Sequence, residues 1–342
     1  MSKLRIGVIG AGMAFAPHAK SLQESGAELE VVTVVARSEA SRNKVREQYG
    51  FAVSDSPDAV WNDRSIDAVM ILTPPNTHHD LVCAAAQAGK HILLEKPLDV
   101  SLSKARALVE VCERNNVLLG AVFQHRFRES SVRLRDVFAQ GELGDIVSIS
   151  IQVPWWRPQS YYDVPGRGTL ERDGGGVLLT QAIHTIDLAL SFAGTVESVF
   201  AYAATSAVHR METEDLVAAS LRFKNGAIGT LHASTACYPG YAEQIRIAGT
   251  KGSATLEGDA LAINLFDGRQ ILCGSPSVQG GGADPMAFSH QSHCALLRAF
   301  VQAVRSQSAP VPSGRDALRV HVLIEAMLRS AREARPVMLA DC

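Results

Sequence analysis

Short apolar runs alternate with helical patterns over the first part of the chain. Apolar segments at 4–9, 29–35, 68–72 and 92–94 are each followed by helical periodicity, and a last apolar run covers 117–122. Runs that are apolar throughout are typical of parallel strands covered on both faces. This alternation predicts a doubly wound parallel sheet.

Beyond this region the pattern changes. Helical periodicity over 129–139 leads to a strand over 146–153, and alternating or apolar runs follow. Asn225-Gly226 and Asp267-Gly268 between such runs favour tight hairpins. The second half therefore predicts an α+β domain with a large, mostly antiparallel open sheet flanked by helices. Its expected strands are 197–204, 215–223, 227–234, 241–248, 253–257 and 261–266.

The two patterns predict a dinucleotide-binding domain over 1–123 and a substrate-binding and oligomerisation domain over 124–342. The glycine run 280–282 predicts a mobile loop. Two helices are expected after it, and the last one could pack back on the first domain.

The first apolar run ends in a glycine turn, Gly10-Ala11-Gly12, which opens a helical pattern. Gly10 permits a tight turn, and Gly12 lets the backbone approach a pyrophosphate at the helix N-terminus. The third glycine of such a fingerprint would fall at Phe15. The turn predicts a dinucleotide site, and an ordinary strand-to-helix turn is the alternative.

The second apolar run ends in Ala36-Arg37-Ser38, where an NAD site would carry a ribose-binding acid. A guanidinium fits a 2′-phosphate with paired hydrogen bonds. Arg42, one turn into the following helix, could add to it. We therefore expect NADP(H) to be preferred and NAD(H) to be possible, the alternative being a merely solvated Arg37.

The stretch 91–100, HILLEKPLDV, presents a lysine at the end of a strand. Pro97 stops the strand because it has no N–H to donate. Ligands of open α/β sheets bind at the carboxyl ends of the strands. Lys96 is therefore a candidate catalytic residue, with a surface lysine as the alternative.

A turn with two prolines, Thr73–His79, follows the third strand. The prolines block both helix and ladder, which predicts a rigid turn over the cofactor. Thr77 or Asn76 could cap the next helix. We expect the two histidines to be capping or surface groups.

A loop over 154–168 combines two tryptophans, two tyrosines and two arginines with proline and glycine. Aromatic faces bind sugar or carbocyclic rings, and arginine binds carboxylate or phosphate. A loop that packs on its own domain is the alternative.

Asp173–Gly176 opens a helix with a polar stripe. Thr180, His184 and Asp187 share one face by helical spacing, among apolar neighbours. Buried polar groups need partners or a function. His184 is a candidate general base near pH 7, and Asp187 could orient its imidazole.

Composition excludes several classes of protein. With 46% hydrophobic residues, 20% charged residues and a net charge of −2, the chain of 342 residues has no general attraction to nucleic acid or membrane. It shows neither a signal peptide nor a bilayer-spanning apolar run. Six dispersed cysteines without a CxxC pair favour reduced thiols and a cytoplasmic location. His290-x-x-His293-Cys294 lacks a third spaced ligand, so we expect no metal and place His290 in the substrate pocket.

The chain resembles the Gfo/Idh/MocA oxidoreductases, named for glucose–fructose oxidoreductase and inositol dehydrogenase. GVIGAG, TPPNTHH, EKP and the GGG…His184 element carry the resemblance, in the family's order and spacing. It implies an oxidoreductase in which Lys96 and His184 are catalytic, and a homodimer or homotetramer formed through the second sheet. The expected cofactor contacts are Gly10, Gly12, Met13, Ala14, Arg37, Ser38, Arg42, Thr73, Pro74, Asn76, His78, Glu95, Lys96, Gln124, Trp156 and Arg157. The expected substrate contacts are Lys96, His125, Tyr161, Tyr162, Thr180, Gln181 and His184.

Thr180 departs from the family pattern, which commonly has Asp or Asn four residues before the histidine. LLTQAIHTIDL and YYDVPGRGT look like a subgroup that includes dehydrogenases of cyclic dihydrodiols. The expected substrate is a small cyclic polyol, a sugar derivative or a cyclic dihydrodiol. The alternatives are a non-catalytic dinucleotide sensor and a dehydratase- or hydrolase-like use of bound NAD.

Overall fold

The computed structural model describes residues 2–275 and 289–339. They form two compact units. Unit 1 comprises Met1–Gln124 with Ser289–Leu318, and unit 2 comprises His125–Phe288 with Arg319–Cys342. Residues 289–318, which we expected in the second domain, thus cluster with the first. The glycine run 280–282 lies outside the described residues.

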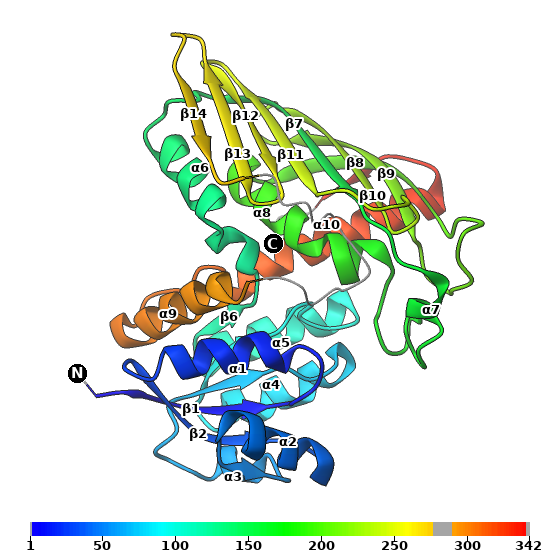
Figure 1. Ribbon diagram of the computed structural model, residues 1–342. Helices are drawn as coiled ribbons and strands as arrows, with labels where there is room; N and C mark the ends of the chain where they lie inside the picture. Colours follow the sequence, from blue (N-terminus) through cyan, green and yellow to red (C-terminus); the bar gives the residue numbers. More distant parts are fainter. Residues whose placement is uncertain (1, 276–288, 340–342) are drawn as a thin grey trace. The chain divides into compact units, whose positions relative to one another are not determined.

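Unit 1 is built on a six-stranded sheet in which all strands are parallel, in the order β3-β2-β1-β4-β5-β6. Its strands are β1 Leu4–Ile9, β2 Leu29–Val35, β3 Val53–Ser54, β4 Ala68–Ile71, β5 His91–Leu94 and β6 Leu119–Ala121. Its helical segments are α1 Phe15–Glu24, α2 Glu39–Tyr49, α3 Asp58–Trp61, η1 Pro75–Thr77, α4 His78–Gln87, α5 Leu102–Arg114 and α9 Gln291–Ser306 (Figure 1). The predicted doubly wound parallel sheet is confirmed.

Buried apolar strands explain this architecture. All four residues of β4 are buried, because helices cover both faces of a parallel sheet. The start of α5 also follows from the sequence, since the Ser101 hydroxyl accepts from the N–H of Lys104 at 3.3 Å. Pro74 precedes η1, and α4 continues from it.

The cap predicted for α4 is wrong. Thr77 occupies the N-cap position without a side-chain cap bond. Its hydroxyl donates instead to the Pro74 carbonyl at 2.8 Å, and the Thr73 hydroxyl lies 2.7 Å from the same oxygen. The side chain therefore closes the preceding turn, and Asn76 lies within η1.

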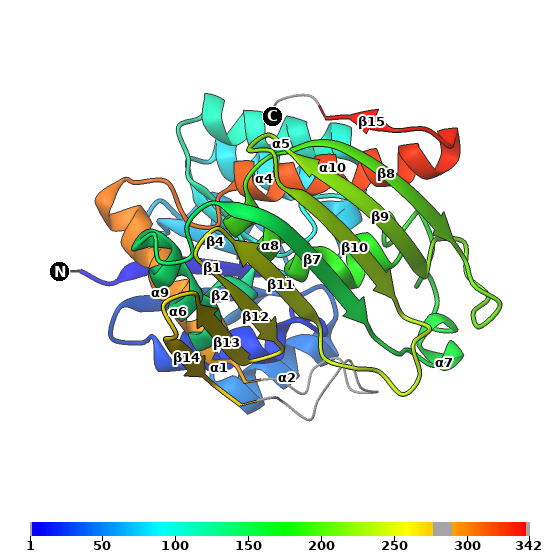
Figure 2. The same cartoon turned by 90° about the horizontal axis from the view of Figure 1, so that it is seen from above.

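Unit 2 contains a nine-stranded sheet in the order β14-β13-β12-β11-β7-β10-β9-β8-β15 (Figure 2). Its strands are β7 Ile146–Pro154, β8 Val196–Ala204, β9 Leu216–Phe223, β10 Ile228–Ser234, β11 Gln244–Gly249, β12 Gly252–Glu257, β13 Ala260–Leu265, β14 Gln270–Cys273 and β15 Val337–Met338. Its helical segments are η2 Gln124–Phe127, α6 Glu129–Ala139, α7 Gln159–Tyr162, η3 Leu178–Ala182 and α8 Ile183–Ala193, with α10 Gly314–Glu333 reaching it from unit 1.

All neighbouring strands of this sheet pair antiparallel except β7 and β10, which are parallel. The predicted hairpins are confirmed between β9 and β10 and between β13 and β14, and β11 and β12 form a further one. In β9, Val217, Leu221 and Phe223 are buried while alternate residues are exposed. The sheet thus has one packed face and one open face. Within the described ranges, every helix is too short or too polar to cross a membrane.

Candidate functional site

The glycine turn between β1 and α1 has the form that a dinucleotide site needs. Gly10 has a φ of +104°, and a Cβ there would lie 2.8 Å from the carbonyl carbon of Leu72. A Cβ on Gly12 would meet no atom within 4 Å, so protein packing leaves the start of α1 open. N–H groups at such an open helix start favour a pyrophosphate, so the turn fits the expected dinucleotide. Phe15, which replaces the third glycine, is buried and packs edge-on against Tyr49.

Two neighbours of the turn belong to the same predicted set. Met13 is 59% exposed, and Ala14 is the N-cap residue of α1. The Gly10 N–H donates to the Val35 carbonyl at 2.9 Å, which places the turn beside the end of β2. The start of α1 and the end of β2 are therefore adjacent, as a bound dinucleotide requires.

At the end of β2, the three predicted phosphate-binding residues have different environments. Ser38 caps α2 by accepting from the N–H of Ser41 at 3.2 Å. Arg42 donates to the carbonyls of Ala36 at 2.9 Å and Arg37 at 2.7 Å, which fixes the backbone of the strand end. The Arg37 side chain is exposed. Arg37 is therefore the guanidinium best placed for a 2′-phosphate, and Arg42 supports it through the backbone.

His78 holds the turn that follows Lys96. Its ring is completely buried, with Nδ1 2.9 Å from the Pro97 carbonyl and Nε2 2.8 Å from the Thr73 carbonyl. Burial lowers the pKa of His78, while the carbonyl groups at its two ring nitrogens oppose this shift. The expectation of a capping or surface histidine is wrong for His78. Its ring joins the two loops at the carboxyl edge of β4 and β5.

Glu95 holds the same turn on the other side. Its Oε2 accepts from the backbone N–H of Lys96 at 2.6 Å, and its Oε1 lies 3.3 Å from His18 Nε2. Burial alone would raise the pKa of Glu95, but His18 and the Lys96 charge outweigh it, and the carboxyl stays ionised. His18 lies edge-on to His293 at 4.9 Å, and burial lowers the pKa of His293 to about 3. The sequence patterns did not single out His18, because its partner is 77 residues away.

His184 follows a helix start that differs from the prediction. Residues 178–182 form a π-helical turn, and regular helix begins only at Ile183. The Glu214 carboxylate accepts from the N–H groups of Gly176 at 3.1 Å and Leu178 at 3.2 Å. A Cβ on Gly176 would lie 1.8 Å from the Glu214 carbonyl oxygen, so only glycine fits there. The π-turn therefore begins against the Glu214 segment, and such turns are frequent at functional sites.

Thr180 stands within this π-turn. Its hydroxyl donates to the Gly176 carbonyl at 2.7 Å and also contacts the side-chain oxygen of Gln181. Bonding of threonine to the carbonyl four residues earlier competes with regular helix and bends it. Thr180 thus contributes to the local helix geometry.

The imidazole of His184 is buried and stacks on that of His125, with ring centroids 4.8 Å apart. His125 Nε2 lies 2.8 Å from the Arg128 guanidinium. Because a guanidinium only donates, this nitrogen must accept, and His125 is neutral with its proton on Nδ1. Arg128 in turn binds the Glu243 carboxylate at 2.6 Å. His184 therefore packs against a neutral ring of fixed tautomer.

Asp187 has a partner that was not foreseen. Arg126 binds it with two hydrogen bonds, from Nε at 2.7 Å and from a terminal nitrogen at 2.6 Å. The Asp187 side chain is fully buried, so this is a buried bidentate ion pair between η2 and α8. Both carboxylate oxygens accept from the guanidinium, and the expectation that Asp187 orients the His184 imidazole stays a prediction.

The aromatic loop packs largely on its own unit. Arg157 is buried between the Trp155 and Tyr161 rings, at 5.4 and 5.6 Å from their centroids. The Tyr162 hydroxyl and the Thr235 hydroxyl are hydrogen-bonded at 2.7 Å. Trp156 pairs with Ala236 through a β-bridge. Tyr161 and Trp156 are half-buried, and their predicted contacts with substrate and cofactor stay predictions, as do those of Arg157 and Tyr162.

His290 lies elsewhere than predicted. It is the N-cap residue of α9, and its Nε2 is 2.6 Å from a carboxylate oxygen of Glu24 at the end of α1. The glycine turn lies at the opposite end of α1. The expectation that His290 lines a substrate pocket is therefore wrong.

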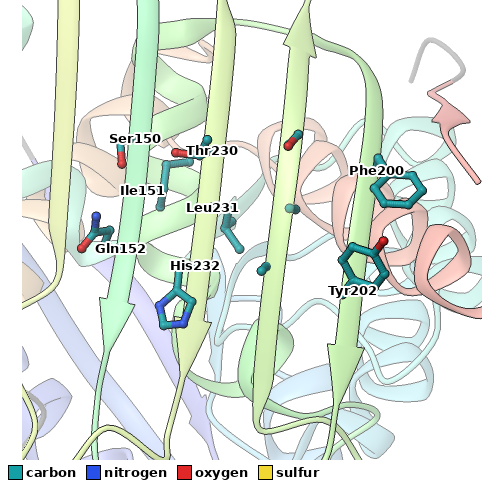
Figure 3. A pocket seen from close by; sticks show the side chains of 11 residues that line it. Ser150, Ile151, Gln152, Phe200, Tyr202, Thr230, Leu231 and His232 are labelled. Carbon is teal, nitrogen blue, oxygen red and sulfur yellow. The ribbon is translucent and has the colours of Figure 1, made fainter. Parts of the chain in front are cut away.

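A shallow pocket marks the open face of the nine-stranded sheet. Figure 3 shows its lining, with Gln152 on β7, His232 on the neighbouring β10, and Tyr202 on β8 beyond β9. Tyr202 is 69% exposed. The pocket contains neither Lys96 nor His184. It is therefore separate from the candidate chemistry.

Two models of one family match this chain. Residues 4–123 match the oxidoreductase family with an NAD-binding Rossmann fold, and residues 131–255 match the GFO/IDH/MocA C-terminal domain. Myo-inositol 2-dehydrogenase of Thermotoga maritima is 28% identical, over 99% of this chain and 99% of that protein. The scyllo-inositol 2-dehydrogenase (NAD(+)) of Bacillus subtilis is 27% identical, over 98% and 96%.

Solved structures agree with this match. The WlbA dehydrogenase from Bordetella pertussis, in complex with NADH and UDP-GlcNAcA, is 28% identical with a TM-score of 0.84, over 100% of both chains. Levoglucosan dehydrogenase in complex with NADH has a TM-score of 0.87 at 21% identity, again over 100% of both chains, and shares the fold.

Proposed function

Because the chain belongs to the Gfo/Idh/MocA family of NAD-binding oxidoreductases, we propose that it interconverts an alcohol and a carbonyl on a small ring compound. Lys96 and His184 are the proposed catalytic residues. One observation carries the proposal. The turn that presents Lys96 is held by Glu95 and by His78, at the carboxyl edge of the dinucleotide-binding sheet. A surface lysine needs no such support.

In the proposed reaction, a bound nicotinamide dinucleotide supplies the hydride acceptor. The carbinol C–H bond breaks with its electron pair, and the hydroxyl proton passes to the neutral imidazole of His184. The Lys96 ammonium stabilises the negative charge that develops on the oxygen. His125, stacked on His184 and bonded to Arg128, keeps the ring in place.

Replacing Lys96 with Met tests this assignment. Turnover should fall by about 10²–10⁴-fold, while cofactor affinity, measured by fluorescence quenching, changes little. Lys104→Met on the exposed face of α5 is the matched control and should behave as wild type. A Lys96 variant with unchanged turnover would remove the lysine from the mechanism.

The proposed substrate is a cyclic polyol, a sugar derivative or a cyclic dihydrodiol. Support comes from the inositol dehydrogenases among the relatives and from the half-buried aromatic side chains Trp156 and Tyr161. A panel of inositols, sugars, sugar acids and dihydrodiols, followed by reduced-nicotinamide fluorescence, would identify it. Turnover of acyclic alcohols alone would contradict the ring-compound proposal.

We propose that NADP(H) is preferred over NAD(H). The exposed Arg37 stands at the end of β2, with its backbone fixed by Arg42. Arg37→Asp should lower the ratio of kcat/KM for NADP to that for NAD by at least about tenfold, because a phosphate contact is replaced by repulsion. Arg46→Asp, on the exposed face of α2, is the control. An unchanged ratio would contradict the phosphate assignment.

We also propose a homodimer or homotetramer formed through the open face of the nine-stranded sheet, in a cytoplasmic protein. Tyr202 and Ile228 on this face are 69% and 60% exposed. Sedimentation equilibrium measures the state, and a monomer at micromolar concentration would contradict the proposal.

A non-catalytic dinucleotide sensor is the second candidate, because Thr180 stands where the family commonly has an acid. Its hydroxyl is bonded to the helix backbone. Cofactor binding without turnover of any compound in the panel would favour this function.

A further inference from the structure

Three potential metal ligands meet where α1 ends and α9 begins. His290 Nε2 lies 2.6 Å from one carboxylate oxygen of Glu24, and Cys294 Sγ lies 3.4 Å from the other. All three ligand atoms lie within 4.8 Å of one another. His290 and Cys294 are four residues apart, so both side chains leave α9 on the same face.

We propose that Glu24, His290 and Cys294 bind a divalent transition metal, with Zn²⁺ as the ion that fits them best. Imidazole nitrogen, thiolate sulfur and carboxylate oxygen are all zinc ligands, and this mixed set suits a borderline-soft ion. Zinc bonds of about 2.0–2.3 Å place the ligand atoms of a tetrahedron about 3.3–3.8 Å apart. Small movements of the exposed Glu24 and half-buried His290 side chains would reach this geometry, with water as the fourth ligand.

A second pair in the same unit shows why spacing alone is insufficient. His79 and Cys83 are also four residues apart, on α4, with Nε2 and Sγ 3.8 Å from each other. The nearby Asp80 engages the other ring nitrogen of His79, at 3.0 Å. In the described parts of the chain, Glu24, His290 and Cys294 are the one group of three. The difference is the carboxylate that α1 contributes, 266 residues before His290.

The proposed site is remote from the dinucleotide turn. Glu24 ends the ten-residue helix α1, and the glycine turn precedes its start, about 15 Å away. A metal at Glu24 would therefore join the end of α1 to the start of α9, away from the glycine turn. Because the ion binds the folded arrangement of the two helices, it would stabilise unit 1 by mass action.

Metal binding would exchange a proton for the ion. The Cys294 S–H bond breaks, the proton passes to solvent, and the sulfur binds the metal with the electron pair. Burial raises the pKa of the Cys294 thiol, so the thiol is protonated at neutral pH. Apparent affinity should therefore rise about tenfold per pH unit through the neutral range.

Cobalt titration of the chelator-treated full-length protein tests the proposal, because Co²⁺ substitutes for zinc and a cobalt–thiolate bond absorbs in the near ultraviolet. We expect one equivalent to bind with a thiolate band that Zn²⁺ abolishes. Cys294→Ser should lose the band. Glu24→Gln and His290→Asn, both at exposed or half-exposed positions, should weaken binding at least about tenfold and keep the wild-type circular dichroism.

Cys83→Ser is the matched control and should bind cobalt as the wild type does. Loss of the band in Cys83→Ser, or its persistence in Cys294→Ser, would assign the thiolate to another site and overturn the proposal. Binding without a thiolate band would overturn it as well. Each readout is independent of catalysis, so the test stands whatever the substrate proves to be.

Discussion

The two candidate catalytic residues are positioned in different ways. Lys96 stands on a turn whose backbone is bound by other side chains: Glu95 accepts from its N–H, and His78 lies against the Pro97 carbonyl. His184 stands on a helix, where its ring stacks on His125 and the neighbouring Asp187 is paired with Arg126. The lysine is fixed through its own main chain, and the histidine through packed side chains.

This difference has a consequence for substitution. A buried ion pair next to a helix contributes to the stability of the whole unit, since breaking it leaves a charge without compensation. Hydrogen bonds to the backbone of one turn act locally, and their loss should change the position of Lys96 more than the stability of unit 1. Substitutions at the ion pair near His184 should therefore mainly lower stability. Substitutions around the Lys96 turn should mainly lower turnover.

The largest effect on stability should come from Asp187→Asn. The substitution removes the buried negative charge that pairs with the Arg126 guanidinium, so the free energy of unfolding should fall by about 3–5 kcal/mol in urea titrations. Glu325→Gln is the control, because Glu325 pairs with Arg332 on the surface, and it should cost about 1 kcal/mol or less. Equal losses in the two variants would contradict the importance of burial.

A smaller effect is expected for His78→Phe. The buried carbonyl of Pro97 and the part-buried carbonyl of Thr73 lose their contacts with the ring, which should cost about 1–3 kcal/mol of unfolding free energy. Because the Lys96 turn then moves, kcat should fall more than the loss of stability suggests. His79→Phe, at a partly exposed position beside it, should change both quantities little. A wild-type kcat in the His78 variant would contradict the role of His78 in positioning the Lys96 turn.

The smallest expected effect is on the pH dependence of stability, of which His293→Gln should remove one part. Burial lowers the pKa of His293 from 6.5 to about 3, so the unfolded chain binds more protons between these values. The contribution of His293 is therefore complete above about pH 6.5 and is lost as the pH falls toward 3. As the pH falls through this range, the free energy of unfolding of the wild type should decrease by up to about 1.4 kcal/mol more per pH unit than that of the variant. Parallel denaturation series at pH 7.5, 6 and 5 measure this difference. If the free energy of unfolding changed equally with pH in both proteins, the lowered pKa of His293 would be contradicted.

Local patterns in the sequence predicted much of the fold. The buried strands of unit 1, the cap at Ser101 and the hairpin at Asn225-Gly226 each depend on neighbouring residues, so the sequence alone indicates them. Gly10 and Lys96 were recognised for the same reason. These features need no knowledge of distant contacts.

The surroundings of the candidate site could not be predicted in this way. Glu214 binds the start of the π-turn from 36 residues away, and Arg126 binds Asp187 across 61. His78 looked like a surface residue because nothing nearby in the sequence shows that two loops enclose it. Pairings of this kind depend on which segments the fold brings together, and periodicity does not encode them.

The parallel pair in the second sheet also bears on how the chain folds. β10 pairs with β7 along its whole length, from Ile228 with Ser148 to Ser234 with Pro154. Everything from 155 to 227 lies in the crossover between them, including the aromatic loop and the helix of His184. Contacts of such long sequence separation form slowly, because a large loop must close before they contribute. His184 should therefore reach its final environment late in folding, when the hairpins on either side have already formed.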